Sequence, residues 1–421
     1  MIPPIDALTL EPPKTWRVQP FWSLFRREKQ TGFPDEELLS VYRDHGVVPT
    51  ASRDDNNNKP SEDLSGYQLV TEGALVTNKM KAWQGSISIS RYRGIVSPAY
   101  YVYQPLSGEH DQFLHYLLRS EPYIALYQRI SKGVRVNQWD LEHEALRTIP
   151  VLLPDLPTQK RIAAFLDRET ARIDELIAKK ERLVAVLREG LLSELERLVT
   201  PDTPIHDQLI PFRWVCRITE GQVDPTAPEW ADKPLIAPNH IESRTGRLIA
   251  IETAQDQGAI SGKYAFPSGT VLYSKIRPNL AKACVSTVEG MCSADMYPVL
   301  PDKRLRPQFL LMQLLSEKFT DWATLESMRV AMPKINRETL GSYRLWVPAL
   351  DVQEKAAATF FAAQAQNEAL SDKVIQSIDR LREYRAALIT AAVTGQIDVD
   401  SYGKSGTPSA TLDRIEEEMP G

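Results

Sequence analysis

Two stretches of the chain concentrate basic, amide and aromatic residues. Those of the first half are Asn78, Lys79, Lys81, Trp83, Gln84, Arg91 and Arg93, and those of the second half are Lys263, Ser274, Lys275, Arg277, Asn279 and Lys282. Arginine and lysine can bond the guanine edge, asparagine and glutamine the adenine edge, and aromatic rings can pack on a sugar or a thymine methyl. This mixture is typical of loops that contact base pairs, although a solvated surface loop also explains any one of these residues.

The sequence contains no residues at the spacing of a phosphate-binding loop or a metal site. The segment Gly258–Lys263 is one residue short of a phosphate-binding loop, and Tyr264 follows where a magnesium-binding Ser or Thr is required. His110 and His115 lack a nearby third ligand. The sequence therefore predicts no catalytic residue, no metal site and no cofactor in this chain.

Composition sets further limits. The 421 residues are 43% hydrophobic and 25% charged, which predicts two or three folded domains. The formal charge of −5 argues against indiscriminate coating of nucleic acid, but acidic residues such as Glu416, Glu417 and Glu418 gather at the C-terminus. Local basic patches remain possible elsewhere. No run of eighteen apolar residues and no signal-peptide pattern is present, so we expect a cytoplasmic protein without membrane contact.

The chain repeats itself. An offset of 194 aligns residues 135–200 with 329–394, and an offset of 196 pairs Lys79 with Lys275 further upstream. At the start, an offset of 198 pairs Pro13 and Trp16 with Pro211 and Trp214. A period this long indicates a duplicated domain, since solenoid repeats are about 20–50 residues long.

Each repeat ends in a long amphipathic segment, 158–199 and 351–394, which predicts two helices of about 40 residues. We expect them to pack antiparallel as a coiled coil, although each stripe could instead pack on its own domain. The predicted seam consists of Ile173, Leu176, Ile177, Val184, Leu187, Leu370, Val374, Ile378, Leu381 and Leu388.

The units that precede these helices have a mixed α/β pattern. Strands are predicted at 86–90, 100–103 and 270–273, and helices at 111–118 and 307–315. The fold expected is therefore two repeated α/β domains separated by two long antiparallel coiled-coil helices.

The sequence resembles a known family, the specificity subunits of type I restriction-modification systems. Residues 153–184 and 377–399 are similar to its two spacer regions, and 94–103 and 269–283 to segments of its target-recognition domains. Thr158 and Val352 depart from the family, which usually has Glu before the glutamine that follows each of them. The resemblance implies recognition domains at 1–154 and 201–348 and spacer helices at 155–200 and 349–399. The composition of residues 400–421 predicts a flexible acidic tail.

The resemblance also implies partners and a division of labour. Each domain would read one half of a bipartite, asymmetric site on double-stranded DNA, while the helices set the spacing and dock two methyltransferase subunits. Those subunits would bring S-adenosylmethionine for adenine-N6 methylation, and motor-nuclease subunits would use ATP and Mg²⁺. The alternative is a helical adaptor that binds only proteins.

Overall fold

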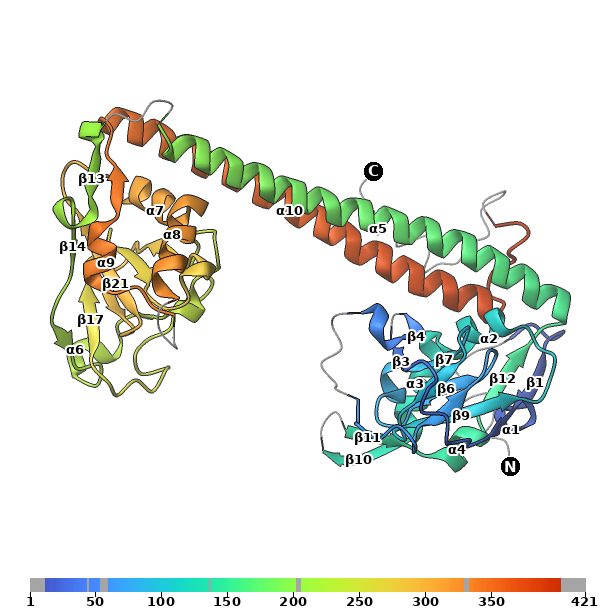
Figure 1. Cartoon of the computed structure of the whole chain (residues 1–421). Helices are drawn as coiled ribbons and strands as arrows, with labels where there is room; N and C mark the ends of the chain where they lie inside the picture. The colour runs from blue at the N-terminus through green and yellow to red at the C-terminus, as the bar shows by residue number, and fades with distance from the viewer. Residues whose placement is uncertain are drawn as a thin grey trace. The chain divides into compact units, whose positions relative to one another are not determined.

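The structure is a computed structural model that describes residues 12–43, 45–53, 60–135, 138–201, 206–328 and 333–402. The chain divides into two compact units, one of Met1–Glu181 with Ile375–Gly421 and one of Arg182–Val374. Each unit contains one α/β domain and part of each of two long helices, α5 (Leu156–Val199) and α10 (Leu350–Val393), which Figure 1 labels. The expected fold class is confirmed.

The domain of the first unit is built around a four-stranded antiparallel sheet in the order β2-β9-β6-β7. Its strands are β2 (Phe25–Arg27), β6 (Leu75–Asn78), β7 (Ile87–Ile89) and β9 (Tyr100–Pro105). Paired strands surround this sheet: β1 (Arg17–Pro20) with β12 (Pro150–Leu153), β3 (Leu39–Tyr42) with β4 (Gly46–Pro49), β5 (Gln68–Val70) with β8 (Gly94–Val96), and β10 (Ser131–Arg135) with β11 (Gln138–Leu141). The helices are α1 (Phe21–Leu24), α2 (Asp111–Leu118), α3 (Glu121–Ile130) and α4 (His143–Arg147).

The domain of the second unit has the equivalent sheet in the order β14-β21-β18-β19. Its strands are β14 (Cys216–Ile218), β18 (Val271–Ser274), β19 (Ala283–Val285) and β21 (Met296–Pro301). A second sheet contains β15 (Gln222–Val223), β17 (Lys263–Phe266), β20 (Gly290–Cys292) and β16 (Leu235–Ile236), and β13 (Leu209–Pro211) pairs with β22 (Arg344–Trp346). The helices are α6 (Pro228–Ala231), α7 (Pro307–Leu315), α8 (Glu317–Ser327) and α9 (Arg337–Ser342). The strands expected near 86–90, 100–103 and 270–273 and the helices expected at 111–118 and 307–315 are all confirmed.

The two central sheets share their register as well as their strand order. Leu75 pairs with Tyr103 in β9 and with Ile89 in β7. In the second domain Val271, 196 positions later, pairs with Val299 and Val285, which are also 196 positions after their counterparts. The duplication inferred from the sequence is therefore present at the level of single backbone pairs.

The start of the repeat differs from the sequence expectation. Val18 pairs with Leu152, and Leu209 pairs with Trp346, which is 194 positions after Leu152. The backbone thus equates Val18 with Leu209, an offset of 191. The expected offset of 198, which matched Pro13 and Trp16 with Pro211 and Trp214, was wrong. Two residues of the same type can coincide by chance, whereas the strand with which a segment pairs fixes its place in the fold.

The long helices run antiparallel within each unit. In the first unit, Asp174 pairs with Arg385 at 2.8 Å and Glu181 with Arg382 at 3.0 Å, so the partner's number falls as the residue number rises. In the second unit, the amide of Asn367 donates to the carbonyl of Leu187 at 2.7 Å.

The residues of the predicted seam differ in burial and form three groups. Ile173, Ile177, Val374, Ile378, Leu381 and Leu388 are buried, and Val184 and Leu187 are half-buried. Leu176 and Leu370 are instead 43% and 44% exposed, so they lie outside the buried stripe. Adjacent helical residues point about 100° apart, and Ile177 rather than Leu176 occupies the buried side.

The beginning of the predicted tail packs on the first unit. Asp400 pairs with Arg161 of α5 at 3.2 Å, and the ring of Tyr402 lies 5.0 Å from that of Phe165. Residues 400–402 are therefore held in place, unlike the flexible segment that was expected. The rest of that segment, 403–421, lies outside the described residues.

Candidate nucleic-acid interface

Lys79 and Lys275 are held by the same pair of backbone hydrogen bonds. The N–H of Lys79 donates to Ala99 at 3.0 Å, and its carbonyl accepts from Leu141 at 2.9 Å. The N–H of Lys275 donates to Asp295 at 2.9 Å, and its carbonyl accepts from Ile335 at 2.9 Å. Each lysine directly follows a central strand, β6 or β18, so both domains place it at the same point of their fold.

Each of these lysines lies over a tyrosine ring. The Nζ of Lys79 is 4.7 Å from the ring centroid of Tyr101, and the Nζ of Lys275 is 5.4 Å from that of Tyr297. Tyr101 and Tyr297 are 196 positions apart, as the two lysines are. A cation within about 6 Å of a ring centroid is attracted to the ring face, which restricts where the ammonium lies.

A third residue at equivalent positions contacts the tyrosine ring in each domain. The ring of His143 lies 5.7 Å from that of Tyr101, and the guanidinium of Arg337, 194 positions later, lies 5.6 Å from the ring of Tyr297. We call the residues of the first domain cluster 1; they are Arg27, Lys79, Tyr101 and His143. We call those of the second domain cluster 2; they are Lys275, Tyr297, Arg337 and Tyr264, whose ring centroid lies 6.0 Å from the guanidinium of Arg337.

Cluster 1 contains a second positive charge besides Lys79. The guanidinium of Arg27 is 4.3 Å from the ring centroid of Tyr101. The pKa of Lys79 is lowered mainly by partial burial and to a smaller extent by the charge of Arg27. Burial, again followed by the charge of Arg27, lowers the pKa of His143, which favours its neutral form at pH 7. In cluster 2, Arg337 pairs with Glu220 at 2.8 Å.

The sequence-predicted residues of the first domain fall into two places. Asn78 is the last residue of β6, and the connection from β6 to β7 contains Lys79, Lys81, Trp83 and Gln84. In this connection the Trp83 ring is 4.9 Å from that of Trp139, and Lys81 and Gln84 are exposed. Arg91 and Arg93 follow the far end of β7. Arg91 donates to Gln112 at 2.5 Å, and Arg93 pairs with Glu36 at 2.8 Å. The structure therefore separates these two arginines from cluster 1 by the length of a strand.

In the second domain, four of the predicted residues share the loop between β18 and β19. These are Lys275, Arg277, Asn279 and Lys282. Arg277 and Asn279 are exposed, and the ammonium of Lys282 donates to the carbonyl of Pro238 at 2.8 Å. Lys263 and Ser274 are buried, with their polar atoms bonded to Ser261 and Ile276. Those two side chains are thus not presented to solvent, contrary to what an interface residue requires.

The β18–β19 loop has an unusual backbone. Arg277 and Ala281 have φ angles of 47° and 45°, the left-handed region that residues with a Cβ seldom occupy. Gly85, which is equivalent to Ala281, has a φ of 90°. The N–H of Arg277 donates to Pro333 at 3.0 Å. Non-glycine residues persist in this region when surrounding contacts hold them there, which is common in binding loops.

Comparison with known proteins assigns the chain to a family. A family model described as the type I restriction modification DNA specificity domain matches residues 15–184 and 216–380. This chain belongs to the type I restriction-modification DNA specificity family. The specificity subunit of the type I restriction enzyme EcoDI from Escherichia coli is 26% identical over 380 residues, 80% of this chain and 83% of that protein.

The fold of this specificity subunit is also that of a solved structure. That chain comes from work on complex assembly and conformational transition of the type I restriction-modification system. It has a TM-score of 0.71 and 16% identity, and the match covers 92% of this chain and 100% of the other. Among the described residues of the specificity subunit, no helix is long and apolar enough to cross a membrane, and no three His, Cys, Asp or Glu side chains are grouped to hold a metal.

Several cluster residues were missed at the sequence level: Arg27, Tyr101, His143, Tyr297 and Arg337. The internal repeat contained the signal for four of them, since an offset of 196 matches the tyrosines and 194 matches His143 with Arg337. Arg27 had no such signal. It reaches Tyr101 because β2 pairs with β9, a contact between segments 74 positions apart.

Proposed function

We propose that this specificity subunit recognises a bipartite, asymmetric DNA site, with each domain contacting one half. The observation that carries the proposal is the recurrence of a lysine held over a tyrosine ring at equivalent positions of two domains whose loops carry different residues. Cations that are restricted in position suit phosphate contacts, which fix the register of a protein on DNA without reading sequence. Clusters 1 and 2 would then set the docking of each domain.

Base reading would come from the exposed residues beside each cluster. Lys81 and Arg277 occupy equivalent positions, both exposed, and each can bond the guanine edge in the major groove. Gln84 in the first domain and Asn279 in the second are exposed amides, which suit adenine. Because the two loops carry different residues on the same frame, the half-sites should differ in sequence.

The long helices would dock partner proteins and set the distance between the half-sites. Leu176 and Ile375 in the first unit and Leu183, Val186 and Leu370 in the second are 43–53% exposed. Exposed apolar side chains along a helix suit a protein partner. We propose two methyltransferase subunits as these partners, with S-adenosylmethionine bound there and ATP and Mg²⁺ bound by motor-nuclease subunits, in the cytoplasm. Catalysis would belong to those subunits.

Binding by the complex of this subunit with its methyltransferase subunits tests the proposal. The target site is first found by mapping methylated adenines in the host genome with and without this subunit. Lys79→Ala and Lys275→Ala should each weaken binding to all duplexes and reduce the slope of log K against log salt by about 0.9, as loss of one phosphate contact does. Lys303→Ala, at an exposed position in a turn, is the control.

The reading loops require a different readout. Lys81→Ala and Arg277→Ala should each lose about 1–3 kcal/mol of discrimination at one half-site and leave the other unchanged. A complex that binds random and target duplexes equally would contradict the proposal, and a complex that binds no duplex would favour the protein-only adaptor.

A further inference from the structure

A small hairpin of the second domain, residues 241–248, contacts both the long helix α10 and the β18–β19 loop. It is closed by the bridge between Ile241 and Leu248 and by the N–H of Glu242, which donates to Arg247 at 2.9 Å. A side chain at Gly246, whose φ is 76°, would come within 3.0 Å of Leu311 and 3.2 Å of Leu315 in α7. The tip of the hairpin is therefore packed closely against the domain.

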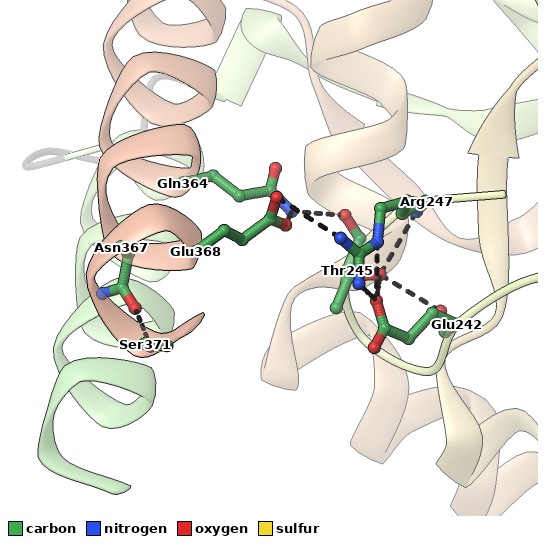
Figure 2. A network of polar contacts seen from close by, with 7 residues as sticks. All are labelled: Glu242, Thr245, Arg247, Gln364, Asn367, Glu368 and Ser371. Atoms are coloured by element: carbon green, nitrogen blue, oxygen red, sulfur yellow. Dashed lines mark hydrogen bonds and ion pairs between the residues drawn. The ribbon is translucent and has the colours of Figure 1, made fainter. Parts of the chain in front are cut away.

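On one side the hairpin is bonded to α10, as Figure 2 shows. Gln364, which is only 8% exposed, donates from Nε2 to the carbonyl of Thr245 at 2.8 Å. Arg247 forms an ion pair with Glu368 at 3.6 Å and another with Glu242 at 2.9 Å. Exposed ion pairs contribute little, so the buried bond of Gln364 is the more important contact.

On the other side the hairpin is bonded to the loop that carries Arg277 and Asn279. The N–H of Arg244 donates to the carbonyl of Ala281 at 3.2 Å, and its guanidinium reaches the carbonyl of Asn279 at 3.5 Å. Ala281 is one of the two loop residues with a left-handed backbone. The hairpin thus contacts the loop at the place where its conformation needs outside support.

The segment of α10 that contacts the hairpin is itself fixed to α5. Asn367 donates to the carbonyl of Leu187 at 2.7 Å, and Ser371 donates to Asn367 at 3.4 Å. Polar contacts therefore run from α5 through α10 and the hairpin to the β18–β19 loop, all within the second unit.

The first unit uses its equivalent positions differently. Thr170 and Asp174 are the α5 residues that correspond to Gln364 and Glu368. Thr170 lies 3.2 Å from the hydroxyl of Tyr116, and Asp174 pairs with Arg385 of α10. The contact between hairpin and helix described for the second domain is thus not repeated by these residues.

We propose that the 241–248 hairpin positions the β18–β19 loop relative to α10, so that Gln364, Glu368 and Arg247 act as positioning residues for one half-site. This inference rests on the proposed function, in which that loop reads bases. Loosening the hairpin should let the loop accommodate wrong bases and altered spacing, while the first domain discriminates as before.

The test uses the complex with its methyltransferase subunits and the variants Gln364→Met, Glu368→Gln and their double. Methionine keeps the length of the glutamine and favours helix, but it cannot donate to Thr245. Glu181→Gln is the matched control because it removes an ion pair between the two long helices that does not involve the hairpin. The half-site of the second domain is identified beforehand as the one affected by Arg277→Ala.

Affinity is measured for the target duplex, for duplexes with one wrong base in either half, and for duplexes with the gap changed by one base pair. The measured quantity is the ratio of affinities for right and wrong duplexes, which does not change if some of the protein is unfolded. In the double variant, this ratio should fall at least about threefold for the second domain's half-site and for the gap. The first domain's half-site should keep its ratio.

An unchanged ratio in the double variant, or an equal fall at both half-sites, would overturn the role of the hairpin while the proposed function stands. Wild-type complex without any sequence preference would overturn both. A fall in Glu181→Gln equal to that of the double variant would show that general loosening of the helices, rather than the hairpin, is responsible, and would also overturn the inference.

Discussion

A buried glutamine in the first turn of each long helix fixes that helix to its domain, and its loss should be costly. Gln353 is fully buried; its Oε1 accepts from the N–H of Arg306 at 2.8 Å, and its Nε2 donates to the carbonyls of Arg304 at 2.8 Å and Pro348 at 2.7 Å. Gln159, 194 positions earlier, makes the equivalent bonds to His110 at 2.9 Å and to Pro154 at 3.0 Å.

Replacing Gln353 with leucine keeps the approximate volume and leaves one N–H and two carbonyls without this partner. An unsatisfied buried polar group costs about 1–3 kcal/mol, and carbonyls are the more tolerant groups. We therefore expect the free energy of unfolding of the second unit to fall by about 3–5 kcal/mol. Gln353→Glu should be at least as damaging, because an ionised carboxylate cannot donate to the two carbonyls.

Urea unfolding gives the free energy, and hydrogen exchange reports the local effect. The amide of Arg306 immediately precedes α7, and a local loss of about 3 kcal/mol would make it exchange on the order of 100-fold faster. Gln366→Leu, at an exposed position of the same helix, should change stability by less than about 0.5 kcal/mol. If Gln353→Leu costs no more than Gln366→Leu, the glutamine does not fix the helix and the reasoning fails.

Three further predictions test other parts of the structure. Gly85→Ala should destabilise the first unit by at least about 1–2 kcal/mol because Gly85 has a left-handed backbone, whereas Ala281→Gly should leave the second unit unchanged or more stable. Thermal unfolding compares the two variants. Equal losses of stability would contradict the left-handed conformation at these equivalent positions. Burial lowers the pKa of His115 to about 3 in the folded protein. The contribution of neutral His115 to the free energy of unfolding is therefore complete above its unfolded pKa of about 6.5, and it is lost as the pH falls below that value. The loss should reach about 3 kcal/mol at pH 4 in urea titrations, and His115→Gln should flatten this dependence; an unchanged curve would show that other groups cause it. Inserting four residues within 170–190 should change the preferred gap between half-sites in binding assays, and an unchanged gap would refute the spacer role.

Much of the architecture followed from the sequence because it depends on local pattern and on repetition. The stripe of apolar residues at helical spacing predicted helices that the structure places at Leu156–Val199 and Leu350–Val393. The offset of 196 correctly paired Lys79 with Lys275, since a duplicated domain keeps its backbone bonds while its surface changes. The offset of 194 similarly matched Gln159 with Gln353 before any role for them was evident.

Other features depended on contacts between distant segments, and only the tertiary structure decided them. Arg91 and Arg93 are close to Lys79 in sequence, but the strand β7 carries them to its opposite end. Lys263 looked like an interface cation, yet its ammonium bonds to Ser261 inside the domain. Leu176 carries an apolar side chain at a spacing that fits the seam, but its neighbour Ile177 occupies the buried side.

The sequence by itself therefore determined the duplication, the two long helices and the residue types available for DNA contact. It could not determine which of those side chains meet, because that depends on strand pairing and on which side of each helix is covered. Arg27 reaches Tyr101 only through the pairing of β2 with β9, and Gln364 reaches Thr245 only because the hairpin packs on α10. Such contacts join segments separated by 74 and 119 positions, and no local pattern encodes them.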